Sequence, residues 1–589
     1  MPVRPAVDAV SARTPPVSTV PASTPALGRA RAPGYLLLAA LAYLPVLRSD
    51  PGRLAADTKT YLFLDPSRLL GRAWSMWDPN IGLGTVSHQT IGYLFPMGPF
   101  FWLGEAVGLP DWVTQRLWLG SIIFAAGLGV LFLLRTLGQR GPGVVVATLV
   151  FILSPYVLDY SSRISVILLP WAALPWLLAL TIRALRDGGW RYPVLIAIVV
   201  QVVGGVNATA LLFAGLAPAL WIPFSVWGLR ETSGRRAFQV VWRTGLVTVL
   251  CSLWWMAGLW AQGGYGLDVL QFTETVRAVS RTSLAPEVLR GLGYWFFYGQ
   301  DKLGPWTESS VAYTQRPLLI LVGYSIPALA FLAAAVIRWR YRTYFVLLLA
   351  VGVAIAVGTY PYDAPSPAGS IFRHLANSSS AGLALRSTGR ATPLVVLAVA
   401  VLLGMGINAL ATRFSDAATP RRWIPIGAAV GVGALAVANF PSLWTGTYYG
   451  SNLERDADVP QYWQDAIAAL DGRPYDTRIL ELPGSDFASY VWGNTVDPIT
   501  PGLTDRPYVA RELIPWGSPA SADLVNALDR RIQEGLFEPD ALAPVARLLA
   551  AGDVVLRNDL QTDRYNLVKI RTLWRQFDPP PDGLGEPET

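Results

Sequence analysis

The stretch "VVVATLVFILSPYVLDYSSRISVILLPWAALPWLLALTIRALRD", Val144 to Asp187, decides the fold. It holds two apolar segments, near residues 142–158 and 164–185, which only a few polar residues separate. A helix needs about 17–25 mainly apolar residues to cross a bilayer, and each segment has that length. The stretch therefore predicts two consecutive membrane-spanning helices.

The same pattern recurs along the chain. Of the 589 residues, 52% are hydrophobic and 15% are charged, whereas soluble domains carry roughly a quarter charged residues. We predict a multi-pass α-helical membrane protein with about eleven transmembrane helices. Besides the two above, the apolar segments lie near residues 33–47, 112–137, 190–206, 208–228, 238–262, 316–337, 341–358, 391–412 and 421–441.

The arginines indicate the orientation in the membrane, because they gather in alternate short connections such as those holding Arg135, Arg186 and Arg338. The positive-inside rule places these connections, and a disordered tail of residues 1–32, in the cytoplasm. Residues 48–111, 263–316 and 359–390 then form outward loops of a transmembrane domain spanning residues 33–444. The net charge is +7, but the basic residues are scattered between apolar segments and form no basic stripe. This argues against nucleic-acid binding.

The composition changes after the last apolar segment. The sequences "VPQYWQDAIAAL" and "ADLVNALDRRIQEGL" have the period of amphipathic helices, and "TRILELPG" and "DVVLRNDL" read as short strands. We predict a small extracytoplasmic α/β domain over residues 445–575 and a disordered tail over residues 576–589.

The first outward loop carries the residues of chemical interest. Its segment Ile91 to Pro110 is apolar but broken by prolines and glycines, so we expect a re-entrant or interfacial element. Transfer of a sugar from a lipid-linked phosphate needs one carboxylate to deprotonate the acceptor and cations to hold the leaving phosphate. Asp57 and Lys59 of "ADTK" supply both, although the same pair also fits an ordinary solvated loop. Four arginines lie in outward positions: Arg163, Arg373, Arg386 and Arg390.

Other polar residues have both a functional and a structural interpretation. His88 and Gln89 fit sugar contacts, or His88 simply bonds to the backbone. Asp159 and Arg163, four residues apart, form either a local ion pair or part of a phosphate site. Asp65, before Pro66, is typical of a helix start. Cys251 is the single cysteine, and the two histidines lie far apart, which argues against a metal site of these residues.

The sequences "ADTK", "QTIGYLFPMGPFFWLG" and "GLPDWVTQRLWL", in that order, resemble the opening of the actinobacterial α-(1→3)-arabinofuranosyltransferase family, whose membrane part is a GT-C glycosyltransferase. The likeness resumes in "VPQYWQDA", "LPGSDFASYVWGNTVDPITPG" and "LLAAGDVVLRNDL" and covers most of residues 33–560. Family members usually continue into β-rich carbohydrate-binding modules, whereas this sequence ends soon after the last motif, so the acceptor stays open.

The resemblance implies inverting transfer of D-arabinofuranose from decaprenylphosphoryl arabinose to an arabinan, at the outer face of the plasma membrane. It places the catalytic carboxylate at Asp57 and carries Lys59 over from the same motif. Arg163 and Arg386 are candidate phosphate ligands on position and charge alone. The expected partners are the polyprenyl-phosphate sugar, a polysaccharide acceptor and membrane lipids. No cofactor is certain, and a role for a divalent cation stays open.

Three alternatives remain at this point. A transporter without catalysis would carry charged residues within its spans, and here the spans are almost free of charge. A GT-C transferase that uses another polyprenyl-phosphate sugar, such as mannose, is compatible with the same residues. A catalytically silent scaffold for cell-wall enzymes is the third alternative.

Overall fold

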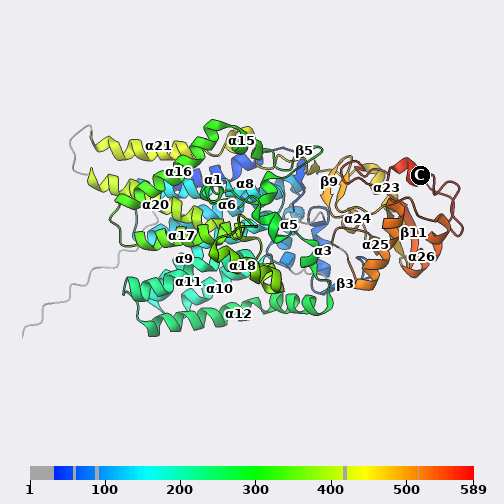
Figure 1. Cartoon of the computed structure of the whole chain (residues 1–589), viewed down its shortest axis with the longest axis horizontal. Helices are drawn as coiled ribbons and strands as arrows, with labels where there is room; N and C mark the ends of the chain where they lie inside the picture. Colours follow the sequence, from blue (N-terminus) through cyan, green and yellow to red (C-terminus); the bar gives the residue numbers. More distant parts are fainter. Residues whose placement is uncertain (1–31, 58–60, 87–91, 415–420, 515, 589) are drawn as a thin grey trace, which may run out of the picture.

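The computed structural model describes residues 32–57, 61–86, 92–414, 421–514 and 516–588. Of the predicted site residues, Lys59, His88 and Gln89 lie outside this described part, as does the predicted tail up to residue 31. A bundle of long helices fills one end of the elongated molecule, and a part that contains most of the strands fills the other (Figure 1).

Each predicted apolar segment is helical in the structure, because such runs satisfy their backbone hydrogen bonds internally and offer side chains for packing. Among the described residues, seven helical stretches are long and apolar enough to cross a membrane. They contain α6 (Asp111–Thr136), α7 (Pro142–Ile152) with α8 (Tyr156–Ser161), α9 (Leu168–Asp187), α11 (Ala208–Pro223), α12 (Gly234–Tyr265), α16 (Pro317–Val336) and α20 (Thr392–Arg413).

The remaining four segments form shorter apolar helices: α1 (Ala32–Leu47), α10 (Arg191–Gly204), α17 (Arg342–Val357) and α21 (Ile424–Ala438). Burial differs strongly across the bundle. The apolar window of Ser165–Asp187 is 94% buried inside the protein, whereas that of α12 is 17% buried. The helix α9 therefore lies at the centre of the bundle and α12 at its edge (Figure 1).

The connection between α1 and α6 folds into short elements at one end of the bundle. They are β1 (Arg53–Ala55), α2 (Tyr61–Leu64), α3 (Pro66–Arg72), β2 (Trp77–Asp78), β3 (Thr85–Val86) and α5 (Met97–Ala106). The carboxylate of Asp65 accepts a hydrogen bond from the Arg68 N–H at 2.9 Å and so caps α3. The predicted helix start at Asp65 is confirmed.

Two other connections lie at the same end of the bundle. Between α12 and α16 lie the 3₁₀ helix η4 (Trp295–Tyr298), the hairpin of β4 (Gln300–Asp301) and β5 (Gly304–Pro305), and α15 (Ser309–Gln315). Between α17 and α20 lie α18 (Pro367–Ser378), α19 (Ser380–Ala384) and the 3₁₀ helix η5 (Thr388–Ala391).

The C-terminal part contains two sheets. The first is parallel, with strand order β10 (Tyr508–Ala510), β7 (Arg478–Leu482) and β11 (Ala551–Leu556). The helices α23 (Gln461–Asp471) and α25 (Pro519–Gln533) and the strands β7 and β11 lie where the sequence predicts them. Smaller helices complete this part: α24 (Thr500–Leu503), α26 (Leu542–Leu548) and α27 (Ile570–Trp574).

The second sheet is antiparallel and joins the two parts of the protein. Its order is β1, β6 (Glu454–Asp456), β9 (Gly493–Val496) and β8 (Ala488–Tyr490). The register pairs Leu54 of β1 with Arg455 of β6. The first loop thus contributes a strand to a sheet of the C-terminal part, which the sequence did not predict.

Residues 576–588, expected to be a disordered tail, lie against the C-terminal part in the structure. The Phe577 side chain is 6% exposed and belongs to the core beside β7 and β10, where Leu584 also packs. Arg473 forms an ion pair with Glu588 at 2.6 Å. These contacts explain why the segment follows the surface of the domain.

Candidate active site

Asp57 lies two residues after β1 and is 2% exposed. Its carboxylate accepts a hydrogen bond from the Ser165 N–H at 2.9 Å and a second one from the Ser165 hydroxyl. Ser165 begins the 3₁₀ helix η1 (Ser165–Ile167), which runs directly into α9. A carboxylate at a helix N-terminus is stabilised by the unpaired N–H groups and the helix dipole there. Asp57 is therefore anchored to the start of the central helix.

A second layer of contacts fixes Ser165. The indole N–H of Trp118, on α6, donates a hydrogen bond to the Ser165 hydroxyl at 3.0 Å. The Trp118 ring packs edge-on against Phe100 of α5, with ring centroids 5.2 Å apart. Because Trp118 is 4% exposed, its ring orientation is set by packing. The first loop and two helices thus determine together where the Asp57 carboxylate lies.

Arg163 lies beside Asp57. Its Nη1 donates a hydrogen bond to the Ala56 carbonyl at 3.1 Å, and its guanidinium carbon is 5.5 Å from the ring centroid of Phe487 in the C-terminal part. Burial lowers the pKa of Arg163, and Asp497, Tyr294, Tyr565 and Asp57 act in the opposite direction. The Arg163 guanidinium is therefore held next to the backbone that carries Asp57, where the bundle meets the C-terminal part.

Tyr294 and Arg390 extend this group of residues. The Tyr294 ring stacks on Tyr160, with centroids 4.4 Å apart. Burial and then Glu274 raise the pKa of Tyr294, while Arg390 and Arg163 lower it. Arg390 donates a hydrogen bond from Nη1 to the Asn207 side chain at 3.3 Å, and its Nε has no hydrogen-bond partner among the described residues.

Two other predicted arginines, Arg386 and Arg373, form hydrogen bonds with other groups of the protein. Arg386 donates hydrogen bonds to the Glu274 carbonyl at 2.7 Å, the Leu383 carbonyl at 3.1 Å and the Thr273 hydroxyl. It also forms an ion pair with the Glu274 carboxylate at 3.6 Å. Arg373 donates to the Tyr362 carbonyl. Arg386 therefore ties the two connections together, and the structure does not bring it to Asp57.

Asp159 and Arg163 form no ion pair in the part of the chain that the structure describes. Asp159 is 2% exposed, and its Oδ1 atom has no hydrogen-bond partner among the described residues. Arg163 points instead to the Ala56 carbonyl and the Phe487 ring. In the same described part, no three His, Cys, Asp or Glu residues form a group that could hold a metal ion.

An apolar cleft of about 500 Å³ opens between the first loop and the edge of the bundle. Pro99, which lines it, precedes Phe100, the residue that packs on Trp118. Across the cleft, the Trp254 indole donates a hydrogen bond to Gln201 at 3.0 Å. The cleft is lined by Leu70, Trp74, Leu94, Phe95, Pro99, Gln201 and Trp254. Its mostly apolar lining suits a hydrocarbon chain.

A comparison with known families shows which family the chain belongs to. The family model of the α-(1→3)-arabinofuranosyltransferase N-terminal GT-C domain matches residues 41–584. The chain belongs to this family. Two curated relatives, both named α-(1→3)-arabinofuranosyltransferase, come from Mycolicibacterium smegmatis and Mycobacterium tuberculosis. They are 30% identical over 547 residues and 31% identical over 548 residues, and each match covers 90% of this chain.

A solved structure shares the fold of this GT-C domain. The cryo-EM structure of the arabinofuranosyltransferase AftD from mycobacteria is 25% identical, matches 93% of this chain and has a TM-score of 0.72. The match covers 37% of that chain, and those to the curated relatives cover 37% and 38% of their lengths. The chain thus spans little more than a third of these proteins.

The sequence reasoning missed several residues that the structure places around Asp57 and Arg163. Ser165 is an unremarkable serine in an apolar stretch, and Tyr294 lies in the aromatic sequence "GYWFFYG". Phe487 and Asp497 lie within "LPGSDFASYVWGNTVDPITPG", so the family motif was the only available signal. Tyr565 lies beyond every motif that carried the resemblance, and nothing in the sequence pointed to it.

Proposed function

We propose that this chain is a membrane glycosyltransferase that moves D-arabinofuranose from decaprenylphosphoryl arabinose to an arabinan or a related cell-wall acceptor. Membership of the GT-C family supports the reaction class. The arginines in alternate connections support a plasma-membrane protein whose site and C-terminal part face outward. The expected partners are the lipid-linked donor, the polysaccharide acceptor and membrane lipids.

The observation that carries the proposal is the buried Asp57 carboxylate together with the Arg163 guanidinium, which is hydrogen-bonded to the carbonyl of the preceding residue, Ala56. Asp57 takes the proton from the acceptor hydroxyl as the hydroxyl oxygen forms its bond to the anomeric carbon of arabinose. The bond from that carbon to the phosphate oxygen breaks, and the phosphate leaves with the electron pair. A single displacement of this kind inverts the anomeric configuration.

Two features fit Asp57 for this role. The hydrogen bonds from Ser165 favour the ionised carboxylate, which is the form that a general base needs. The same two hydrogen bonds also fix the carboxylate in place.

The leaving phosphate needs positive charge more than it needs a proton donor. We assign this role to Arg163, to Lys59 of the same motif, and to Arg390, whose Nε is without a partner among the described residues. Arg386 is less suited, because its guanidinium already binds Glu274, Leu383 and Thr273. With these cations the scheme requires no divalent metal. His88 and Gln89 remain predicted sugar contacts.

We assign the polyprenyl chain of the donor to the apolar cleft. The cleft of about 500 Å³ is bordered by Pro99, and the next residue, Phe100, packs on the Trp118 that holds Ser165. A lipid chain lying there would place its phosphate toward the first loop. Burial of apolar surface stabilises such a complex by about 25 cal/mol for each Å² removed from water.

The test is transfer of arabinose from synthetic polyprenylphosphoryl arabinose to a short arabinan by the purified, membrane-reconstituted protein. Polyprenylphosphoryl mannose serves as the competing donor. Transfer of arabinose, lost in the Asp57→Asn variant, supports the donor and the base together. Transfer of mannose alone would contradict the sugar, and no transfer from either donor by folded protein would contradict the enzymatic role.

A further inference from the structure

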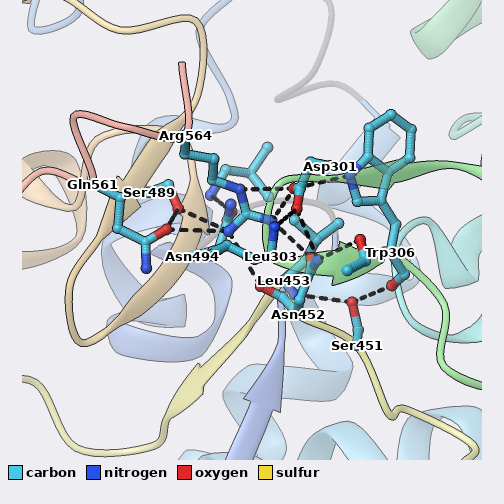
Figure 2. Close-up of polar contacts among 12 residues, drawn as sticks. Asp301, Leu303, Trp306, Ser451, Asn452, Leu453, Ser489, Asn494, Gln561 and Arg564 are labelled. Carbon is cyan, nitrogen blue, oxygen red and sulfur yellow. Dashed lines mark hydrogen bonds and ion pairs between the residues drawn. The ribbon is translucent and has the colours of Figure 1, made fainter. Parts of the chain in front are cut away.

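An ion-pair network joins the β4–β5 hairpin of the bundle to the C-terminal part (Figure 2). The Arg564 guanidinium donates to Asp301 Oδ2 from Nε at 3.0 Å and from Nη2 at 2.6 Å. Nη2 also reaches the Asn452 side chain at 2.7 Å. Nη1 reaches the Asn452 carbonyl, Ser489 and Gln561 at 3.1–3.2 Å. We call Asp301, Asn452 and Arg564 the clasp.

Each of the three side chains of the clasp has several hydrogen-bond partners. Asp301 also accepts hydrogen bonds from the Leu303 N–H at 2.8 Å and the Trp306 indole at 3.0 Å. Although burial opposes it, these bonds and Arg564 lower the pKa of Asp301. The Arg564 side chain is 2% exposed. Because a buried charge with all its partners in place has one preferred geometry, the clasp is a rigid joint between the two parts.

One arm of the clasp reaches the candidate active site through Tyr565, the residue after Arg564. The next residue, Asn566, is also held by the hairpin, because Lys302 donates to its side chain at 2.7 Å. The Tyr565 ring contacts Phe487, with centroids 5.8 Å apart, and Phe487 lies against the Arg163 guanidinium.

A second arm leads from the clasp to Tyr294. Trp306, which donates to Asp301, packs on Phe296 with ring centroids 4.9 Å apart. Phe296 stacks on Tyr294, with centroids 6.2 Å apart. One hairpin therefore supports both Tyr294 and Tyr565, and both tyrosines raise the pKa of Arg163.

We propose that the clasp is a positioning device for Arg163, and that Asp301 and Arg564 are positioning residues of the reaction. This inference rests on the proposed function, in which Arg163 holds the leaving phosphate. The clasp fixes Tyr565, which packs on Phe487, and Phe487 lies against the Arg163 guanidinium, so the clasp sets where that guanidinium lies relative to Asp57. The C-terminal part thereby completes the catalytic unit.

The test compares Arg564→Gln and Arg564→Lys with Lys569→Ala in the full reconstituted chain. Lys569 pairs with Asp563 near the clasp, but the two side chains are 58% and 86% exposed, so its loss serves as the matched control. A displacement of about 1 Å can cost roughly 100-fold in rate, so we expect Arg564→Gln to lower kcat/KM for the lipid donor by about 10–100-fold. Arg564→Lys should recover part of this loss, and Lys569→Ala should match the wild type.

A double variant separates positioning from general loss of structure. If Arg564 acts through Arg163, then Arg564→Gln should cost little more in a protein that already carries Arg163→Ala. Full additivity of the two losses would overturn the inference. So would wild-type kcat/KM in Arg564→Gln, even where the wild type transfers arabinose and the proposed function stands.

Hydrogen exchange tests the clasp without any catalytic assay. Arg564→Gln should speed amide exchange in residues 561–566 and also around Arg163, just before η1, whereas Lys569→Ala should change neither. Faster exchange at 561–566 with no change around Arg163 would overturn the inference. This readout holds even if the wild type transfers no sugar, so failure of the proposed function is distinguishable from failure of the clasp.

Discussion

Ser165 holds Asp57 with two hydrogen bonds, from its N–H at 2.9 Å and from its hydroxyl. The contact joins the first loop to the start of the central helix, 108 residues further along the chain. Asp57 is thus a helix cap as well as the proposed base. A useful experiment must separate these two roles.

Asp57→Asn and Asp57→Ala separate them. Asparagine keeps an oxygen that can accept the Ser165 N–H, so we expect nearly unchanged thermal unfolding but a loss of about 10²–10⁴-fold in transfer rate. Alanine also removes the cap, which should cost about 0.5–2 kcal/mol in unfolding free energy. Melting curves and turnover of both variants check this. An Asp57→Asn protein with normal turnover would refute the base assignment.

Arg163 and Arg386 should respond differently to the same substitution. Arg163→Gln removes a proposed phosphate ligand, and we expect a KM for the lipid donor raised by about 10-fold or more, as loss of a charged hydrogen bond of about 1.5–3 kcal/mol implies. Arg386→Gln removes the ion-pair partner of Glu274 and a hydrogen-bond donor to two carbonyls, so its main effect should be a lower melting temperature. The reverse outcome would return the phosphate role to Arg386.

Trp118→Phe tests the support behind Ser165. Phenylalanine keeps an aromatic ring against Phe100 but cannot donate to the Ser165 hydroxyl. We expect a loss of about 0.5–1.5 kcal/mol in stability, the usual net worth of one hydrogen bond, and a modest fall in turnover. Chemical denaturation and initial rates measure both effects. Unchanged stability would mean that packing alone holds Ser165.

Glu454, on β6, should make stability depend on pH. Burial and then Asp50 raise the pKa of Glu454 to about 7, although Arg53 opposes the shift. The folded state then keeps a proton that the unfolded state loses above its ordinary pKa near 4.5, so stability should fall as pH rises from about 4.5 to 7.

Glu454→Gln should remove this fall and raise the melting temperature at pH 8 by a few degrees. The substitution also removes the ion pair of Glu454 with Arg53, but this costs little stability, because a surface ion pair is worth about 0–1 kcal/mol. Asp456→Asn, on the same strand and 71% exposed at its side chain, is the matched control. Melting curves between pH 5 and 8 decide the matter. If the melting temperature of Glu454→Gln changed with pH in the same way as that of the wild type, the raised pKa of Glu454 would be contradicted.

The sequence predicted the helices well, because a long apolar run has few folded alternatives in lipid. It also predicted β7 and β11, because each is a short, mostly apolar run next to turn-forming residues. It could not predict β1, since three residues carry no readable period. The strand exists because β6 offers it a partner, and that pairing is a tertiary effect.

The site was predicted in part. Charge and position placed Asp57 and Arg163 in outward connections, and in the structure Arg163 is hydrogen-bonded to Ala56, the residue before Asp57. Charge alone could not show that Arg386 already has a carboxylate partner in Glu274. The sequence analysis did not predict Phe487 and Tyr565 as site residues. An aromatic residue in a water-facing domain looks the same in sequence whether it fills a core or lines a site.

The pairing of β1 with β6 has a consequence for biosynthesis. Ser49, just before β1, bonds to the Gly446 carbonyl, 397 residues later in the chain. During synthesis the first loop therefore waits, without its sheet partner, until almost the whole bundle has been inserted. The four-stranded sheet that joins the two parts can form only once β6 has been made, so the joint between the parts is assembled after the helices of the bundle.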